Sequence, residues 1–345
     1  MQKMLALVDA PVFTEHRAPA GHPERPERLH AARAAVARVE GSFGRADLAA
    51  REATDDELVR VHTPRYLEEL GQAAGRSGYF DEDTFYCPAS VTAARTAAGA
   101  AIVATDALLT SAAAFSVALV RPPGHHARPD TAMGFCLLNN VAVAAAHARA
   151  KGIERVAIVD FDVHHGNGTQ EVFYADPHVL YVSLHQFPFY PGSGAADETG
   201  VQDGRGYTVN IPLSAGAGDA VYAAATDRIV APIIEAYRPQ LLLFSAGFDA
   251  HERDPLAQMQ LTERGFAELV RRTLKPLAPE VGVGFVLEGG YDLIGLGRSL
   301  EAALESLDES AADLADFPSQ PRIWSAHERD LARAQAAAAE LWQVG

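Results

Sequence analysis

The chain has 345 residues, 48% of them hydrophobic, and its formal net charge is −16 at pH 7. This length and apolar content can bury a large core as one big α/β domain or as two smaller ones. Because no linker-like, low-complexity or repeated segment interrupts the sequence, we expect a single domain over residues 1–345. The acidic excess argues against nonspecific binding to nucleic acid or to anionic membranes, and it is compatible with attraction of cationic substrates.

The amino terminus and the cysteine content favour a cytoplasmic protein. The apolar run that begins at Met4 is too short for a secretory signal and predicts a first strand instead. No stretch reaches about 18 apolar residues, so no membrane span is expected. Cys87 and Cys136 are expected to be free thiols in a reducing cytoplasm. Only three of the 29 basic residues are lysines, which with the abundant alanine indicates a bacterial source with a GC-rich genome.

Helical segments alternate with apolar runs along the chain, which predicts a parallel sheet covered by helices on both faces. Thr63 is suited to an N-cap and Pro64 to the first helical position. Helices are expected at residues 26–39, from 64 onward, and at 90–109, 138–150, 219–237, 262–277 and 295–307. The tail at about residues 320–343 predicts a final helix that packs on the domain or on a second subunit, and its low apolar density favours an ordinary surface helix over a homo-oligomer contact.

Chemically reactive side chains follow five apolar runs of the sequence. These runs cover residues 115–120, 156–159, 179–184, 241–245 and 283–287. In open parallel sheets the ligand site lies outside the carboxyl ends of the strands. All five reactive turns fall at such ends, so we expect them to form one site.

A metal site is predicted after the second of these runs. Asp160, Asp162 and His164 occupy alternate positions, and in extended backbone such side chains share one face. Two carboxylates and an imidazole at one point can bind a divalent metal. Asp249 supplies a third protein ligand from a different strand end, which leaves a coordination position open for water and substrate, as in catalytic sites.

Other residues and metals remain open as alternatives. Glu288 or Asp292 could replace Asp249 as the third ligand, although both flank Tyr291 at one strand end. Ligand type alone does not select among Zn²⁺, Fe²⁺ and Co²⁺.

Two further turns carry groups suited to hydrolysis at such a metal. His125 and His126 follow a stiff Pro-Pro pair, and imidazole titrates in the range needed both for a base toward water and for an acid toward a leaving group. Tyr291 follows two glycines, so that its hydroxyl could donate a hydrogen bond to an oxyanion that develops on a carbonyl. The alternatives are exposed histidines and a tyrosine that closes a tight turn.

These motifs together resemble the zinc-dependent histone deacetylase family, more closely its class II branch and the bacterial histone deacetylase-like amidohydrolases. The resemblance covers roughly residues 5–307, and the family is also related to acetylpolyamine amidohydrolases. The matching segments, in the family's order, are Arg121-Pro-Pro-Gly-His-His-Ala127, Gly134-Phe-Cys-Leu-Leu-Asn-Asn140, Asp160-Phe-Asp-Val-His-His-Gly-Asn-Gly-Thr-Gln170, Ser183-Leu-His185, Ala246-Gly-Phe-Asp-Ala250 with Asp254-Pro-Leu256, and Glu288-Gly-Gly-Tyr291.

The resemblance implies an arginase-like α/β fold with an eight-stranded parallel sheet and hydrolysis of an N-acyl amine. By motif, the zinc ligands would be Asp162, His164 and Asp249, and Tyr291 would polarise the acyl carbonyl. His126 would act as general base and then as general acid.

The family pattern also assigns partners to the tandem histidines. His125 would remain closer to an electrostatic partner, and Asp160 would orient it. Asn167 would orient His126, although some relatives have Asp at this position, so that His126 would be tuned differently here.

The resemblance further implies structural potassium. One site would be built from side-chain and main-chain oxygens of Asp160, Asp162, His164, Ser183 and Leu184. A monovalent cation is physically reasonable there, because buried carboxylates need compensating charge. A second, peripheral site would use main-chain oxygens of Phe173, Asp176 and Val179.

The substrate channel implied by the family is narrow and apolar. Gly134, Phe135 and Tyr190 match the positions that enclose the methylenes of an acyl-lysine, and Tyr190 stands where many relatives have Phe. Arg28 matches a residue at the foot of the pocket that would help acetate leave, with a helix-surface arginine as the alternative.

Substrate choice depends on two departures from polyamine-specific relatives. One such relative carries Glu at the position of Leu256, and dimeric acetylpolyamine amidohydrolases carry an insertion for which residues 75–90 are too short. Both departures favour an acylated lysine, or another acylated small amine with a long chain, over a polyamine. The run Phe80-Asp-Glu-Asp83 could still form an acidic rim that binds a peptide backbone or a polycation.

Two other classes of protein are less compatible with the sequence. A ureohydrolase normally requires a two-metal carboxylate cluster, whereas only one metal site is indicated here. A noncatalytic acyl-amine binding module would be favoured by loss of a ligand, of His126 or of Tyr291, and none is missing.

Overall fold

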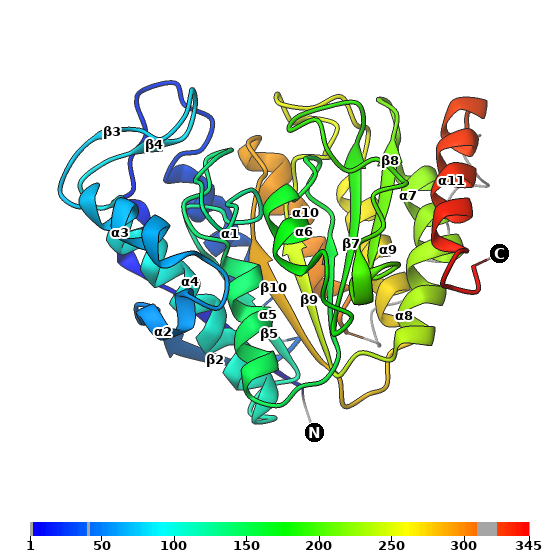
Figure 1. Cartoon of the computed structure of the whole chain (residues 1–345), viewed down its shortest axis with the longest axis horizontal. Helices are drawn as coiled ribbons and strands as arrows, with labels where there is room; N and C mark the ends of the chain where they lie inside the picture. Colours follow the sequence, from blue (N-terminus) through cyan, green and yellow to red (C-terminus); the bar gives the residue numbers. More distant parts are fainter. Residues whose placement is uncertain (1–2, 40–41, 309–322, 345) are drawn as a thin grey trace.

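A computed structural model describes residues 3–39, 42–308 and 323–344 of the chain. These residues form one eight-stranded sheet in the order β2-β1-β5-β10-β9-β6-β7-β8, in which every neighbouring pair is parallel (Figure 1). The eight-stranded parallel sheet implied by the resemblance is therefore confirmed. Its strands are β1 (Met4–Asp9), β2 (Gly44–Ala49), β5 (Phe115–Ala118), β6 (Val156–Asp160), β7 (Val179–Gln186), β8 (Thr208–Leu213), β9 (Leu241–Ala246) and β10 (Gly282–Leu287).

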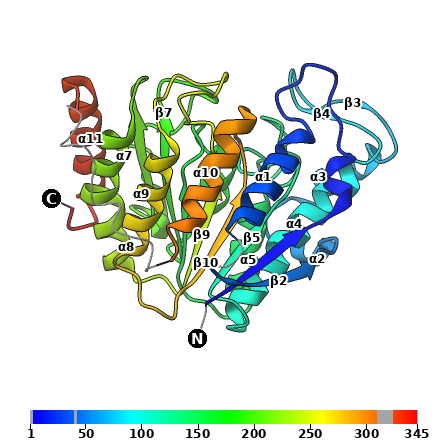
Figure 2. The ribbon, with the colours of Figure 1, turned by 180° about the vertical axis from the view of Figure 1, so that it is seen from behind.

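Helices cover both faces of this sheet. On one face α4 and α5 pack together, and on the other α10 lies between α1 and α9, with α7 and α8 beside α9 (Figures 1 and 2). The helices are α1 (Glu27–Arg38), α2 (Asp55–Leu58), α3 (Pro64–Gln72), α4 (Ser90–Leu109), α5 (Asn140–Ala150), α6 (Asn167–Phe173), α7 (Asp219–Ala225), α8 (Ala231–Tyr237), α9 (Glu263–Leu274), α10 (Leu293–Glu305) and α11 (Ser325–Ala338). Within the described ranges, none of the helices is both long and apolar enough to cross a membrane.

The predicted strands are buried because helices lie on both sides of them. β5, β6, β7, β9 and β10 are buried at every residue, as expected for continuous apolar runs in a parallel sheet. The registers place Asp160, at the end of β6, between Ser183 of β7 and Ser245 of β9. The carboxyl ends of the central strands thus meet at one edge of the sheet.

The predicted helices are also confirmed, with small differences at their ends. Thr63 caps α3, because its hydroxyl accepts the N–H of Tyr66 at 3.2 Å. The single helix expected over residues 219–237 is divided by a π-helical turn at Thr226–Val230. Pro232 at the start of α8 lacks the N–H that would continue the α-helical bonding across this turn.

Two strands of the sheet had no signal in the sequence. β2 alternates between half-buried and exposed residues at the sheet edge, so its sequence lacks an apolar run. β8 is fully buried but contains Asn210 and Pro212, which interrupt the apolar pattern. A short hairpin of β3 (Gly78–Tyr79) and β4 (Phe85–Tyr86) carries the predicted acidic run in its turn.

The carboxyl-terminal helix packs on the domain itself. α11 lies along β8, with Leu331 and Ala334 buried, and Asp330 accepts the N–H of Ser214 at 2.9 Å. Residues 320–322 of the predicted tail lie outside the described residues. The helix therefore covers the outer edge of the sheet (Figure 1).

At Gly99, α4 packs closely against the segment before α2. A Cβ at this position would overlap the Arg51 carbonyl, whereas nothing lies within 4 Å of a Cβ at the helical Gly71. We expect Gly99→Ala to lower the free energy of unfolding by about 1–3 kcal/mol through overpacking, and Gly71→Ala to raise it by about 0.5–1 kcal/mol. Urea denaturation of the two variants measures both changes, and equal stability would contradict the packing of α4.

Candidate metal centre and catalytic site

Three predicted ligands come together at the carboxyl edge of the sheet. Each of Asp162, His164 and Asp249 offers a ligand atom, and these atoms lie within 4.8 Å of one another. His164 Nδ1 lies 3.1 Å from both Asp162 Oδ1 and Asp249 Oδ2. Both aspartates are at most 1% exposed, and the His164 side chain is 12% exposed, so the ligand atoms surround a point that is largely shielded from water.

Backbone groups hold the oxygens that do not face His164. Gly289 N–H donates to Asp162 Oδ2 at 2.8 Å, and Val163 N–H donates to Asp249 Oδ1 at 2.8 Å. A Cβ on Gly289 would overlap both carboxylates, and one on Gly247 would overlap that of Asp162. The two glycines therefore leave the space that the carboxylates need.

The two alternative third ligands serve other purposes. Glu288 Oε2 accepts the N–H groups of Gly124 and His125, at 2.6 and 3.2 Å. Asp292 caps α10 through Gly295 N–H at 2.7 Å and pairs with Arg253. Among the described residues, Asp249 is the third member of the candidate metal group.

Buried negative charge around this point exceeds the buried positive charge. Five carboxylates of the site region, each at most 1% exposed, face two fully buried guanidinium groups, which leaves three uncompensated negative charges when the imidazoles are neutral. The carboxylates belong to Glu24, Asp160, Asp162, Asp249 and Glu288, and the guanidinium groups to Arg28 and Arg121. Burial and the charge of Asp162 raise the pKa of Asp249 to about 7. Keeping both carboxylates charged without a cation therefore costs free energy. The donor set fits a divalent cation, which would compensate most of this charge.

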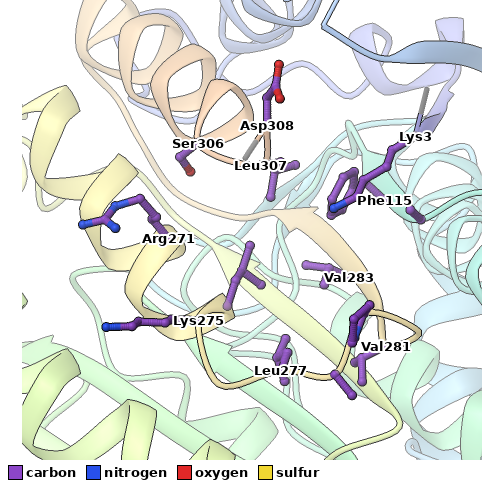
Figure 3. A pocket seen from close by; sticks show the side chains of 14 residues that line it. Lys3, Phe115, Arg271, Lys275, Leu277, Val281, Val283, Ser306, Leu307 and Asp308 are labelled. Atoms are coloured by element: carbon purple, nitrogen blue, oxygen red, sulfur yellow. The ribbon is translucent and has the colours of Figure 1, made fainter. Parts of the chain in front are cut away.

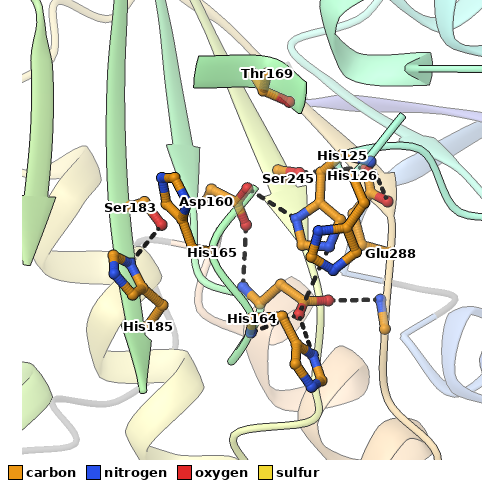
Figure 4. A network of polar contacts seen from close by, with 12 residues as sticks. His125, His126, Asp160, His164, His165, Thr169, Ser183, His185, Ser245 and Glu288 are labelled. Atoms are coloured by element: carbon orange, nitrogen blue, oxygen red, sulfur yellow. Dashed lines mark hydrogen bonds and ion pairs between the residues drawn. The ribbon is translucent and has the colours of Figure 1, made fainter. Parts of the chain in front are cut away.

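The tandem histidines have different partners, and Figure 4 shows that of His125, Asp160. His125 Nδ1 lies 3.0 Å from Asp160 Oδ2, which also accepts the hydroxyl of Tyr181 at 3.0 Å. His126 Nδ1 lies 2.9 Å from Asn167 Oδ1 at the start of α6. The structure thus brings together both of the predicted histidine pairs.

The two imidazoles differ in charge accordingly. Burial disfavours a charged His125, but Asp162 and Asp160 outweigh it and raise the pKa of His125 to about 10. Burial, together with the charges of His125 and His164, holds the pKa of His126 well below its usual range. A neutral His126 beside a cationic His125 is the combination that a base with a nearby positive charge requires.

A hydrogen bond from its backbone N–H to Asp254 helps to fix the position of Tyr291. Its N–H donates to Asp254 Oδ2 at 2.6 Å, and Asp254 Oδ1 accepts the N–H of Leu256 at 3.0 Å. Gly290 precedes Tyr291 with φ of +117°, a region that favours glycine. Asp254 thus links a predicted catalytic residue to a predicted channel residue, a role that its position in the sequence did not reveal.

Arg28 is fully buried, so its interpretation as a helix-surface arginine is wrong. Its Nε donates to Gly290 O at 2.7 Å, its Nη1 to Glu24 Oε1 at 3.0 Å, and its Nη2 to the carbonyl of Glu288. The guanidinium carbon lies 5.0 Å from the centre of the Tyr291 ring. Arg28 therefore supports the segment that carries Tyr291 through the carbonyls of Glu288 and Gly290.

The predicted channel residues lie beside the histidines. Tyr190 packs edge-on against His126, with ring centres 5.1 Å apart, and Phe135 packs edge-on against Tyr291 at 5.9 Å. Gly134 and Phe135 both have positive φ, and a Cβ on Gly134 would overlap the His126 ring. The glycine allows the channel wall to approach the histidine closely.

The residues predicted for the first potassium site share Asp162 and His164 with the metal group. Asp160 faces Ser183 across β6 and β7, and Leu184 follows in β7. The predicted peripheral set falls where α6 leads into β7, with Phe173 ending the helix and Val179 beginning the strand; Asp176 N–H donates to Phe173 O at 3.0 Å.

A separate hollow of about 410 Å³ lies at the amino-terminal ends of the strands, opposite the candidate site (Figure 3). It includes Phe115 and Val283, near the starts of β5 and β10, and none of the predicted site residues line it.

Cys87 and Cys136 are both buried free thiols, as predicted.

Comparison with known proteins identifies the family. The model of the histone deacetylase domain matches residues 22–307. The chain belongs to the histone deacetylase family. Its relatives include a probable deacetylase of Archaeoglobus fulgidus, 40% identical over 87% of this chain and 86% of that protein. The histone deacetylase-like amidohydrolase of Pseudomonas aeruginosa is 44% identical over 79% of this chain and 73% of its own length.

Two further matches extend the family assignment. The human polyamine deacetylase HDAC10 is 42% identical over 93% of this histone deacetylase family chain, which covers about half (49%) of the human protein. The crystal structure of the HDA15 HD domain superposes with a TM-score of 0.90 and 38% identity, over 99% of this chain and 95% of that one. Together the relatives support a deacetylase or amidohydrolase activity.

The choice between Asp249 and Asp292 is open to a direct test. We expect Asp249→Asn to lower bound metal, measured by elemental analysis after dialysis, from about one equivalent to less than a tenth, because a catalytic site requires its third protein ligand. Asp292→Asn serves as the matched control and should retain the metal. Equal metal content in the two variants would remove Asp249 from the site.

Proposed function

We propose that this protein is a zinc-dependent amidohydrolase that removes an acetyl or other acyl group from an N-acylated amine, with acyl-lysine as the preferred substrate class. The observation that carries the proposal is the buried group of Asp162, His164 and Asp249 with His125, His126 and Tyr291 around it. Asp160 and Asn167 would orient the two histidines, and Gly134, Phe135, Tyr190 and Leu256 would form the channel.

The chemistry that Zn²⁺ supplies when held by such ligands is Lewis acidity toward a carbonyl oxygen and a water molecule. The other steps fall to the side chains. Asn167 Oδ1 can only accept a hydrogen bond, so His126 carries its proton on Nδ1 and leaves Nε2 free to take a proton from water. The water oxygen bonds to the acyl carbon, the C–N bond breaks, and His126 returns the proton to the leaving amine. The products are an amine and a carboxylic acid, and the acid then releases its remaining proton to solvent.

Tyr291 and His125 would stabilise the charges that develop. The Tyr291 hydroxyl is an uncharged donor, because burial raises its pKa well above the usual range, and it would donate to the acyl oxygen. A charged His125 would offset the negative charge near the reacting centre. The resemblance places Arg28 at the foot of the pocket, and three of its five N–H groups donate to Glu24, Glu288 and Gly290, so we assign it to support of the Tyr291 segment.

We also propose that potassium occupies the site of Asp160, Asp162, His164, Ser183 and Leu184, and more peripherally that of Phe173, Asp176 and Val179. The buried carboxylates of Asp160 and Asp162 support the first of these, because a monovalent cation beside them would offset part of their negative charge.

A polyamine substrate is the second candidate, since the human relative of that name is 42% identical. Burial and, to a smaller extent, the charges of Asp83 and Asp81 in the β3–β4 turn raise the pKa of Tyr190. These carboxylates could attract a distant ammonium group. Leu256 is apolar where a polyamine-selective relative has Glu, so we rank this substrate second.

The proposal is tested with initial rates on acetyl-lysine peptides, longer acyl-lysines and N-acetylated polyamines, each with and without a chelator. We expect turnover to be highest on an acyl-lysine, to be lost with chelator and to return with Zn²⁺. Tyr291→Phe should lower kcat about 100-fold or more through loss of a carbonyl donor while it retains the metal. Turnover that survives complete metal removal would contradict the proposed mechanism.

Leu256 provides a test of substrate choice. Leu256→Glu should raise the ratio of kcat/KM for N-acetylated polyamine over acetyl-lysine peptide about tenfold, which corresponds to roughly 1.4 kcal/mol. Leu256→Gln is the uncharged control of the same size and should leave this ratio within about twofold. The same shift in both variants would show that shape, not charge, sets the preference.

A further inference from the structure

Glu288 joins two loops of the proposed site. Residues 121–126 carry the tandem histidines, and residues 288–291 end in Tyr291. Glu288 Oε2 accepts two backbone N–H groups of the first loop, those of Gly124 at 2.6 Å and His125 at 3.2 Å. Figure 4 shows Glu288 beside His125. Its Oε1 accepts the hydroxyl of Ser245 at 3.3 Å, and its side chain is 0% exposed.

Glu24 joins the same two loops from the other side. It accepts Arg121 on both carboxylate oxygens, with Nη2 to Oε2 at 2.5 Å, and Arg121 begins the histidine loop. It also accepts Arg28, which in turn donates to the carbonyls of Glu288 and Gly290 in the tyrosine loop. The contacts form a closed ring: histidine loop, Glu288, tyrosine loop, Arg28, Glu24, Arg121 and histidine loop again.

We propose that Glu288 and Glu24 are positioning residues that set the separation between His126 and Tyr291. The inference rests on the proposed function, in which His126 and Tyr291 act on opposite sides of one amide. The two loops come from different strands, β5 and β10, and each bond of the ring is buried, so water does not replace a lost partner. Without Glu288, two buried N–H groups lose their acceptor, and the histidine loop must shift to find another.

The first experiment compares Glu288→Ala with Glu288→Gln. In the Ala variant we expect kcat to fall about 100-fold with KM within about threefold, because an error of about 1 Å in a reacting group has this effect. Gln can still accept both N–H groups with one oxygen and offer its amide to Ser245, so it should recover all but about fivefold of kcat. Ser245→Ala is the matched control, since it removes only the weaker contact.

Other outcomes of this comparison would contradict the proposal. If Glu288→Ala loses stability while kcat per folded molecule is unchanged, Glu288 is structural alone. If Gln is as slow as Ala, acceptance of the two N–H groups is not its function. Metal content is measured in each variant, and loss of metal would assign the effect to the metal group instead.

A second experiment tests whether Glu24 acts through the same ring. In that case Glu24→Gln and Glu288→Ala should each lower kcat, and the double variant should be about as slow as Glu288→Ala alone. Multiplied effects would mean two independent supports. If Glu24→Gln does not fold, Arg121→Lys tests the same link, because lysine keeps the charge and loses the two-pronged contact.

Amide hydrogen exchange tests the ring without reference to catalysis. In Glu288→Ala we expect faster exchange in residues 121–126 and also in residues 288–291, and Glu24→Gln should have the same effect on both loops. Faster exchange in one loop alone would contradict the ring. If the two variants show this coupling but the wild-type protein turns over no amide, the ring stands and the proposed function is wrong.

Discussion

The site depends on the cost of holding several carboxylates close together away from water. Asp160, Asp162 and Asp249 meet at the ends of two adjacent strands, and Glu288 follows the next strand in the sheet. Charges of one sign in such a place are stable only when hydrogen bonds and opposite charges compensate them. The surrounding structure supplies part of this compensation, and the negative charge that remains is suited to a bound cation.

Backbone N–H groups provide much of that compensation, and this explains the abundance of glycine at the edge of the sheet. Gly289 donates to Asp162, and Gly124 donates to Glu288. A Cβ at Gly289 would overlap the Asp162 and Asp249 carboxylates, and one at Gly124 would overlap the backbone at Asn140. These glycines are places where the backbone must closely approach a charged side chain or another backbone segment.

The sequence predicted the parts of the fold and of the site in which information is local. Continuous apolar runs identified β5, β6, β7, β9 and β10, because strands covered on both faces need no polar residues. Alternating spacing placed Asp162 and His164 together, and a position after another strand end supplied Asp249. β2 and β8 escaped detection because an exposed alternation and an internal proline remove the same signal.

The supporting residues could not be predicted, since their partners are remote in the chain. Arg28 resembled a surface residue of a helix, and Glu24 is separated from Arg121 by 97 residues. Glu288 contacts Gly124 across 164 residues. Arg28 has one nearby partner in Glu24, four residues earlier, but its contacts with the carbonyls of Glu288 and Gly290 span 260 and 262 residues. The family pattern could therefore assign Arg28 to the pocket without revealing what holds it there.

The difference between Asp160 and Asn167 gives two adjacent imidazoles different electrostatic environments. A carboxylate at His125 Nδ1 stabilises the charged ring, whereas an amide oxygen at His126 Nδ1 fixes the position of one proton without adding charge. Once His125 is charged, its repulsion helps to keep His126 neutral, so each histidine reinforces the state of the other. The second partner therefore does not need to be a carboxylate: an aspartate at position 167 would favour a charged His126 and weaken the asymmetry on which a base next to a fixed cation depends.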